Sequence, residues 1–150
     1  MEPVVIESIS FVSTDPGVIG FEERGILVKE SVEMAQLHVC RRNGADGEVS
    51  VGWRTIDKTA KNGQDYVGGE GVLVFKHSEM KRTLEIPIVN DMVAEKDECF
   101  EVELFDPTGG ATLGTITKMA VTITNDDGMT VLMNLLNCKN HKLNSPKVTG

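Results

Sequence analysis

Short stretches in which apolar and polar residues alternate are the main pattern of this 150-residue chain. Ala35, Leu37 and Val39, for example, alternate with Gln36, His38 and Cys40, as expected of a strand with one buried face. The predicted strands are 17–22 with 25–29 (one broken strand), 35–40, 49–53, 72–75, 84–88, 100–104 and 116–124. Seven short strands without a helical period between them predict an all-β fold, an immunoglobulin-like antiparallel β-sandwich of about seven strands.

The segments between these strands contain turn residues and many carboxylates. If successive strands run up and down, alternate connections meet at one pole of the sandwich, and these connections are acidic: Glu30, Glu33, Asp57, Asp65, Asp91, Glu95, Asp97, Glu98, Asp126 and Asp127. The opposite pole is expected to hold a mixed set that includes bases: Arg41, Arg42, Asp46, Lys76, His77, Lys81 and Asp106. Turns are expected at residues 43–47, 77–79 and 106–110, and a long polar loop at 57–71.

Residues 88–100 carry several oxygen donors between two apolar segments, which is how proteins bind hard cations. Calcium takes six to eight oxygen ligands from carboxylates, carbonyls and water. The loop lacks the spacing of an EF-hand, so a cation site would be built from several loops of the sandwich. The alternative is that these carboxylates are solvated and bind nothing, as most surface Asp and Glu residues do.

Composition excludes several function classes. The chain has 23 acidic and 15 basic residues and a net charge of −8, which argues against a nucleic-acid partner. The sequence contains neither an apolar run of membrane-spanning length nor a signal peptide, which predicts a soluble segment without direct membrane insertion. An odd number of cysteines, Cys40, Cys99 and Cys138, favours a reducing compartment and free thiols. Since catalytic motifs are absent from the sequence, we expect no enzyme activity.

The order of motifs from residue 57 onward resembles the Calx-β domain. The matching segments are 57–66, 71–75, 95–100 and 125–127, and the resemblance covers residues 17–127, leaving an N-terminal extension at 1–16 and a short apolar segment with a polar tail at 128–150. Calx-β domains are immunoglobulin-like sandwiches that occur in pairs in the cytosolic loop of sodium/calcium exchangers and as repeats in some adhesion proteins. Residues 16–22 and 43–49 look more like the second exchanger domain than the first.

The resemblance implies a set of calcium ligands. Carried over position by position, these are Glu30, Asp65, Asp91, Glu95, Glu98, Asp126 and Asp127. Strongly binding members of the family have runs of aspartate where this chain has Asn90, Met92 and Asn125, and an acid where it has Lys96. Because these changes remove charge and oxygen donors, we predict that calcium binding is weak or absent.

The sequence therefore predicts a non-enzymatic regulatory module that senses calcium or transmits a calcium signal. The resemblance implies as partners a neighbouring Calx-β domain and the transmembrane part of an exchanger, and places the domain in a cytosolic loop of a plasma-membrane protein. The alternative from another class is a structural Calx-β repeat of an extracellular adhesion protein. We also expect Trp53 to pack at least partly against the core.

Overall fold

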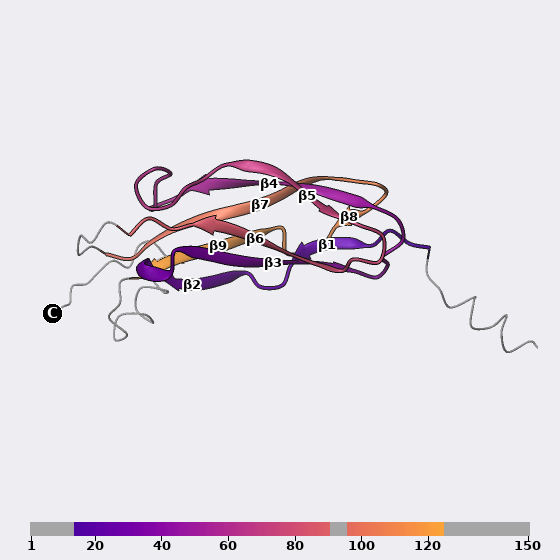
Figure 1. Cartoon of the computed structure of the whole chain (residues 1–150), viewed down its shortest axis with the longest axis horizontal. Coiled ribbons are helices and arrows are strands. Elements are labelled where there is room, and N and C mark those ends of the chain that lie inside the picture. Colours follow the sequence, from indigo (N-terminus) through magenta and orange to yellow (C-terminus); the bar gives the residue numbers. More distant parts are fainter. Residues whose placement is uncertain (1–13, 91–95, 125–150) are drawn as a thin grey trace, which may run out of the picture.

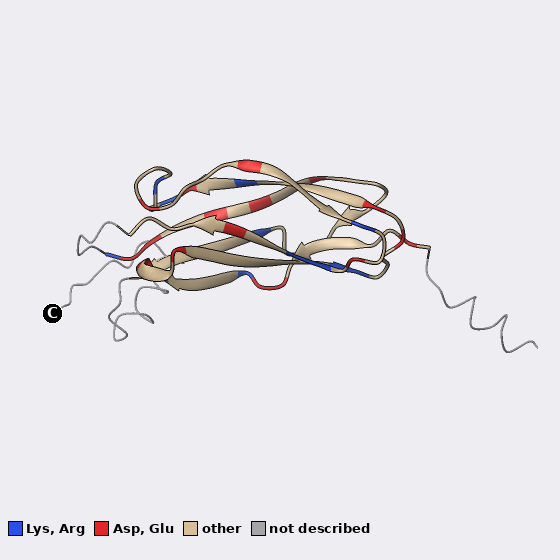
Figure 2. Cartoon of the chain, viewed as in Figure 1, with Lys and Arg blue, Asp and Glu red and all other residues tan. Residues whose placement is uncertain are grey.

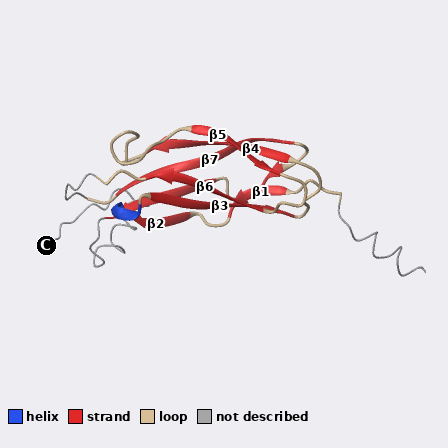
Figure 3. Ribbon diagram, viewed as in Figure 1, coloured by secondary structure: helices blue, strands red, loops and turns tan. Residues whose placement is uncertain are grey.

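A computed structural model describes residues 14–90 and 96–124. The described residues form two sheets packed face to face and almost no helix (Figures 1 and 3). The elements are β1 (Val18–Phe21), β2 (Gly25–Lys29), the 3-10 helix η1 (Glu30–Val32), β3 (Met34–Arg42), β4 (Val49–Asp57), β5 (Glu70–Phe75), β6 (Lys81–Pro87), β7 (Glu98–Thr108), β8 (Thr112–Leu113) and β9 (Lys118–Thr124). One sheet has the order β6-β3-β1-β8 and the other β2-β9-β7-β4-β5. The predicted β-sandwich is confirmed.

The break expected in the first strand separates two strands of different sheets. β1 pairs antiparallel with β3, whereas β2 pairs in parallel with β9 in the opposite sheet. The polar residues 22–24 thus carry the chain from one sheet to the other. This crossing and the two-residue strand β8, which is too short to show an alternating pattern, explain why nine strands are described where about seven were expected.

The turn predicted at residues 106–110 begins later than expected. β7 continues to Thr108, which pairs with Ser50 beyond a register shift at which β7 has one more residue than β4, and the two side-chain oxygens lie 2.6 Å apart. Gly109 and Gly110 then make the turn with φ angles of 74° and 91°. Cross-strand pairing therefore extends the strand past Pro107, because this proline lies in the register shift, where a strand residue without an N–H is tolerated.

Inward-facing residues of the two sheets form one core. The alternation predicted for 35–40 is confirmed, since Ala35, Leu37 and Val39 are fully buried. Trp53 is partly buried and packs against this core, as expected. Because it is not fully buried, its replacement by alanine should cost less than the roughly 3–5 kcal/mol typical of a buried tryptophan.

The connections between the strands gather at the two ends of the sandwich. One end, here called the acidic pole, carries residues 30–33, the loop 58–69, the connection after β6 and the end of β9 (Figure 1). Acidic residues occur on these connections (Figure 2). The opposite pole carries residues 43–48 and 76–80 together with the turn after β7.

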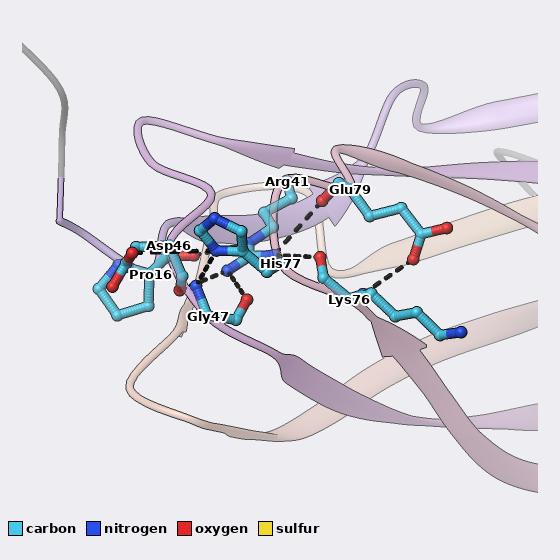
Figure 4. Close-up of polar contacts among 7 residues, drawn as sticks. All are labelled: Pro16, Arg41, Asp46, Gly47, Lys76, His77 and Glu79. Carbon is cyan, nitrogen blue, oxygen red and sulfur yellow. Dashed lines mark hydrogen bonds and ion pairs between the residues drawn. The ribbon is translucent and has the colours of Figure 1, made fainter.

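Arg41, one of the bases predicted at the opposite pole, is buried. Its side chain is fully buried, and its guanidinium donates hydrogen bonds to five backbone oxygens (Figure 4). These are the carbonyls of Pro16 (2.7 Å), Lys76 (3.1 Å), Glu79 (3.4 Å), Asp46 (2.8 Å) and Gly47 (2.7 Å). The fixed fork of an arginine suits such a set of acceptors, so Arg41 joins the start of the domain to two separate connections.

The predicted turn at residues 43–47 contacts both the connection that carries His77 and the start of the domain at Asp15. The Gly47 N–H donates to Nδ1 of His77 at 2.8 Å, which links the two connections a second time (Figure 4). Gly44 has a φ of 147°, and a Cβ there would lie 2.2 Å from the Asp15 oxygen. Only glycine permits this close approach, so Gly44 lets the turn lie against the start of the domain.

The expectation that all cysteines are free thiols is wrong for Cys99. Cys40 is free and buried, and its burial together with the nearby Glu22 carboxylate raises the pKa of the thiol. Cys99, at the start of β7, is disulfide-bonded, and its partner lies outside the residues that the structure describes. An odd cysteine count is compatible with one disulfide and one free thiol, so the count alone could not establish a reducing compartment.

Thiol counting tests this correction directly. We expect one free thiol per chain under denaturing, non-reducing conditions and three after reduction, because one disulfide uses two of the three cysteines. Three thiols before reduction would show that the disulfide does not form in the protein as isolated. That result would favour a reducing compartment.

Candidate functional site

Three of the seven predicted calcium ligands lie in the described residues, and each belongs to a different element of the acidic pole. Glu30 begins η1, Asp65 lies in the loop between β4 and β5, and Glu98 begins β7. All three are partly buried. The other predicted ligands, Asp91, Glu95, Asp126 and Asp127, lie outside the described residues.

Backbone hydrogen bonds join the connections that carry these residues. The Ile88 N–H donates to the Glu33 oxygen at 2.9 Å, and the Val89 N–H donates to the Asp65 oxygen at 3.0 Å. The connection that leaves β6 toward Asn90 is therefore bonded to both the η1 segment and the Asp65 loop. Oxygen donors from distant parts of the sequence are thus held at one end of the molecule.

The loop between β4 and β5 is also bonded to the start of β7. The Ala60 N–H donates to the Cys99 oxygen at 2.8 Å, and the Cys99 N–H donates to Oγ1 of Thr59 at the same distance. Cys99 follows Glu98 directly. The positions of Asp65 and Glu98 are consequently set by one bonded unit.

Asp65 is fixed by its own loop. Its Oδ2 accepts the Lys61 N–H at 2.8 Å, and its N–H donates to the Lys61 oxygen at 2.9 Å. A carboxylate has about four lone-pair sites on two oxygens, so this bond orients the group and leaves acceptor capacity for a cation. Oxygen donors of this kind are the chemistry that calcium prefers.

The buried Tyr66 and the exposed Asp57 form a contact that the sequence did not reveal. The Tyr66 hydroxyl donates to Oδ1 of Asp57 at 2.6 Å, and the same oxygen accepts the Asn62 N–H at 2.9 Å. The bond from Tyr66 lowers the pKa of Asp57, while burial and the same bond raise the pKa of Tyr66. Asp57 thus stays charged and anchors the loop, and the only sequence signal is that Asp57 and Tyr66 are the two ends of the matching segment 57–66.

The described carboxylates do not complete a metal site by themselves. Within residues 14–90 and 96–124, no three side chains of His, Cys, Asp or Glu come together closely enough to hold a metal ion. Asn90 and Lys96, which flank the undescribed part of the loop, are exposed. Glu30, Asp65 and Glu98 have the oxygen donors that calcium prefers and lie at the same pole, but a calcium site would need further ligands besides them.

The sequence matches one family of protein domains along most of its length. The sequence model of the Calx-beta domain matches residues 13–128. The chain belongs to the Calx-beta domain family. The match covers all strands of the sandwich and both poles.

Relatives of this Calx-beta domain include two kinds of protein. The sodium/calcium exchanger Calx of Drosophila melanogaster is 34% identical over 113 residues, which is 75% of this chain and 12% of that protein. The adhesion G-protein coupled receptor V1 of Danio rerio is 34% identical over 112 residues, 74% of this chain and 2% of that protein. The chain thus spans only a small part of the relatives it matches.

Two solved structures show the same fold. The apo-form Calx CBD1 domain is 34% identical, with a TM-score of 0.69 and coverage of 73% of this chain and 96% of that one. The Calx CBD2 domain is 24% identical, with a TM-score of 0.72 and coverage of 82% and 95%. Sequence identity is higher for the first domain and structural overlap for the second, so the finer resemblance to a second exchanger domain stays a prediction.

A search of the described residues for helices long and apolar enough to cross a membrane finds none.

Proposed function

We propose that this Calx-beta domain is a non-enzymatic regulatory module of a sodium/calcium exchanger, located in the exchanger's cytosolic loop, and that its acidic pole binds calcium weakly. The observation that carries the proposal is the set of hydrogen bonds by which Glu33, Asp65 and Cys99 join three acid-bearing connections. Such a set brings oxygen donors from distant segments to one place. The exchanger relatives support the same assignment.

Calcium, when bound, would supply a positive charge that neutralises the crowded carboxylates and links the connections of the pole. Glu30, Asp65 and Glu98 would hold it together with the predicted ligands on the undescribed segments. The affinity is low because Asn90 and Asn125 are neutral, Met92 offers no hard oxygen, and Lys96 brings a cation to the same loop.

A neighbouring Calx-beta domain and the transmembrane part of the exchanger are the proposed partners. The match to a structure titled CBD12 from CALX1.2 covers 45% of that chain, with a TM-score of 0.70 and 34% identity. The rest of that chain is large enough for a second domain of similar size. In such a tandem, a change in order at the acidic pole would reach the partner through their contact surface.

A second candidate function is that of a structural repeat in an extracellular adhesion protein. The disulfide of Cys99 favours it, since disulfides persist mainly in oxidising compartments. The similarity to adhesion G-protein coupled receptor V1 favours it as well. The flanking gene sequence separates the two: apolar spans on both sides support the exchanger, whereas a signal peptide and further repeats support the adhesion protein.

Calcium titration by calorimetry tests the proposed site. We expect a dissociation constant of about 10⁻⁴–10⁻³ M, the range of weak calcium modules rather than of sensors. Asp65→Asn should abolish the heat, because it removes charge from a described candidate ligand. Asp106→Asn, an equal change at the opposite pole, should leave it unaltered.

Two results would contradict this reading. Submicromolar binding would mean that backbone carbonyls or water replace the oxygens lost at Met92 and the asparagines. No heat at millimolar calcium would mean that this domain has no calcium site, and regulation would then have to act through contact with the companion domain.

A further inference from the structure

We propose that Tyr66 is a positioning residue for the calcium site: without binding the ion, it holds three ligand-bearing segments of the acidic pole in register. The inference rests on the proposed calcium function. It is carried by three different contacts of one residue, made by the ring, the hydroxyl and the backbone.

The ring of Tyr66 links the loop between β4 and β5 to β7. Tyr66 and Phe100 are both fully buried, and their rings stack with centroids 3.8 Å apart and planes within 6°. Phe100 lies two residues after Glu98, and Tyr66 directly follows Asp65. The stack therefore fixes the distance between the loop that carries Asp65 and the start of β7 that carries Glu98.

The hydroxyl of Tyr66 closes the same loop on itself. It donates to Oδ1 of Asp57 at the end of β4, and that oxygen also accepts the Asn62 N–H. The Gly63 N–H donates to the backbone carbonyl oxygen of Tyr66 at 2.8 Å. Hydrogen bonds thus connect Tyr66 with Asp57 through its hydroxyl and with Gly63 through its backbone oxygen, and Asp57 in turn holds Asn62.

The backbone at Tyr66 reaches the third segment. Tyr66 forms an isolated antiparallel bridge with Ile88, and the adjacent Asp65 oxygen accepts the Val89 N–H. The chain continues from Val89 to Asn90 and into the predicted ligand loop. Tyr66 consequently lies where the segments of Asp65, Glu98 and Asn90 meet.

The hydroxyl itself is not suited to be a ligand. It is buried and donates a hydrogen bond to Asp57, and burial raises the pKa of Tyr66. Residues that orient metal ligands without contacting the metal are nevertheless important, and their loss typically lowers metal affinity about 10–100-fold. Tyr66 occupies such a place with respect to Asp65.

Tyr66→Phe is the informative variant, because it keeps the ring stack and removes only the hydroxyl. We expect the fold to persist, the amides of Lys61 and Val89 to exchange faster with solvent, and calcium affinity to fall about 10-fold. These two amides donate to Oδ2 and the backbone oxygen of Asp65, so they report its position without calcium. Asp57→Asn, which retains an acceptor oxygen, should show smaller changes in the same direction.

Ser50→Ala is the matched control. It removes a side-chain hydrogen bond of equal length, 2.6 Å to Thr108, that lies away from the acidic pole, and it should change neither readout. Unchanged exchange at Lys61 and Val89 in Tyr66→Phe, or unchanged calcium affinity in a chain that binds calcium, would overturn the positioning role. Absence of calcium binding in the unmodified chain would instead overturn the proposed function, and the exchange data would still decide whether Tyr66 orders the pole.

Discussion

Arg41→Ala is expected to destabilise the domain by about 3–5 kcal/mol, the cost of removing one member of a buried charged hydrogen-bond set. The variant removes all the guanidinium hydrogen bonds to the carbonyls of Pro16, Lys76, Glu79, Asp46 and Gly47. The loss of these hydrogen bonds is unfavourable, and the emptied space adds a cavity. Urea unfolding followed by Trp53 fluorescence measures the loss.

Arg41→Lys makes the experiment informative even where the alanine variant fails to fold. A lysine keeps the charge but replaces the planar fork by a single ammonium with three donors, so a smaller yet clear loss is expected. Arg42→Ala is the control, because Arg42 is the exposed neighbour on the same strand. It should stay within about 0.5 kcal/mol of the unmodified chain. Equal stability of the Arg41 and Arg42 variants would show that the buried guanidinium is unimportant.

Phe100→Ala is expected to cost about 3–5 kcal/mol as well, because it empties a fully buried aromatic site in the core. It also removes the ring against which Tyr66 stacks, so calcium binding should be lost together with stability. Chemical denaturation gives the first effect and calcium titration at low temperature the second.

Phe105→Ala provides the comparison on the same strand. Phe105 is partly exposed, and Arg54 lies 4.4 Å above its ring, so its loss should cost only about 1 kcal/mol. Calcium binding should remain. If both phenylalanine variants weakened calcium binding equally, the effect would follow general stability rather than the stack at the acidic pole.

The strands could be predicted from the sequence because their signal is local. Ala35, Leu37 and Val39 alternate with polar residues and are buried in the core, and Val49 and Val51 behave in the same way. The gathering of acidic connections at one end followed from the up-and-down order of the strands alone. Both are consequences of a period of two residues and of chain direction.

The burial of Arg41 and the role of Tyr66 could not be predicted in this way. The partners of Arg41 are backbone oxygens from residue 16 to residue 79, and backbone oxygens have no signature in the sequence. Tyr66 meets Phe100 across 34 positions of the chain, so only the tertiary structure brings the two rings together. The parallel pairing of β2 with β9 likewise depends on a change of sheet that polar residues 22–24 permit without specifying it.

A calcium titration followed by amide NMR tests the proposed calcium site, because it shows both whether calcium binds and where. We expect progressive shifts at submillimolar to millimolar calcium for the amides of Lys61, Val89 and Cys99, which lie on the joined connections of the acidic pole. Amides of Gly47 and Ser78 at the opposite pole should stay in place. Shifts confined to the opposite pole, or none at millimolar calcium, would contradict the assignment of a calcium site to the acidic pole.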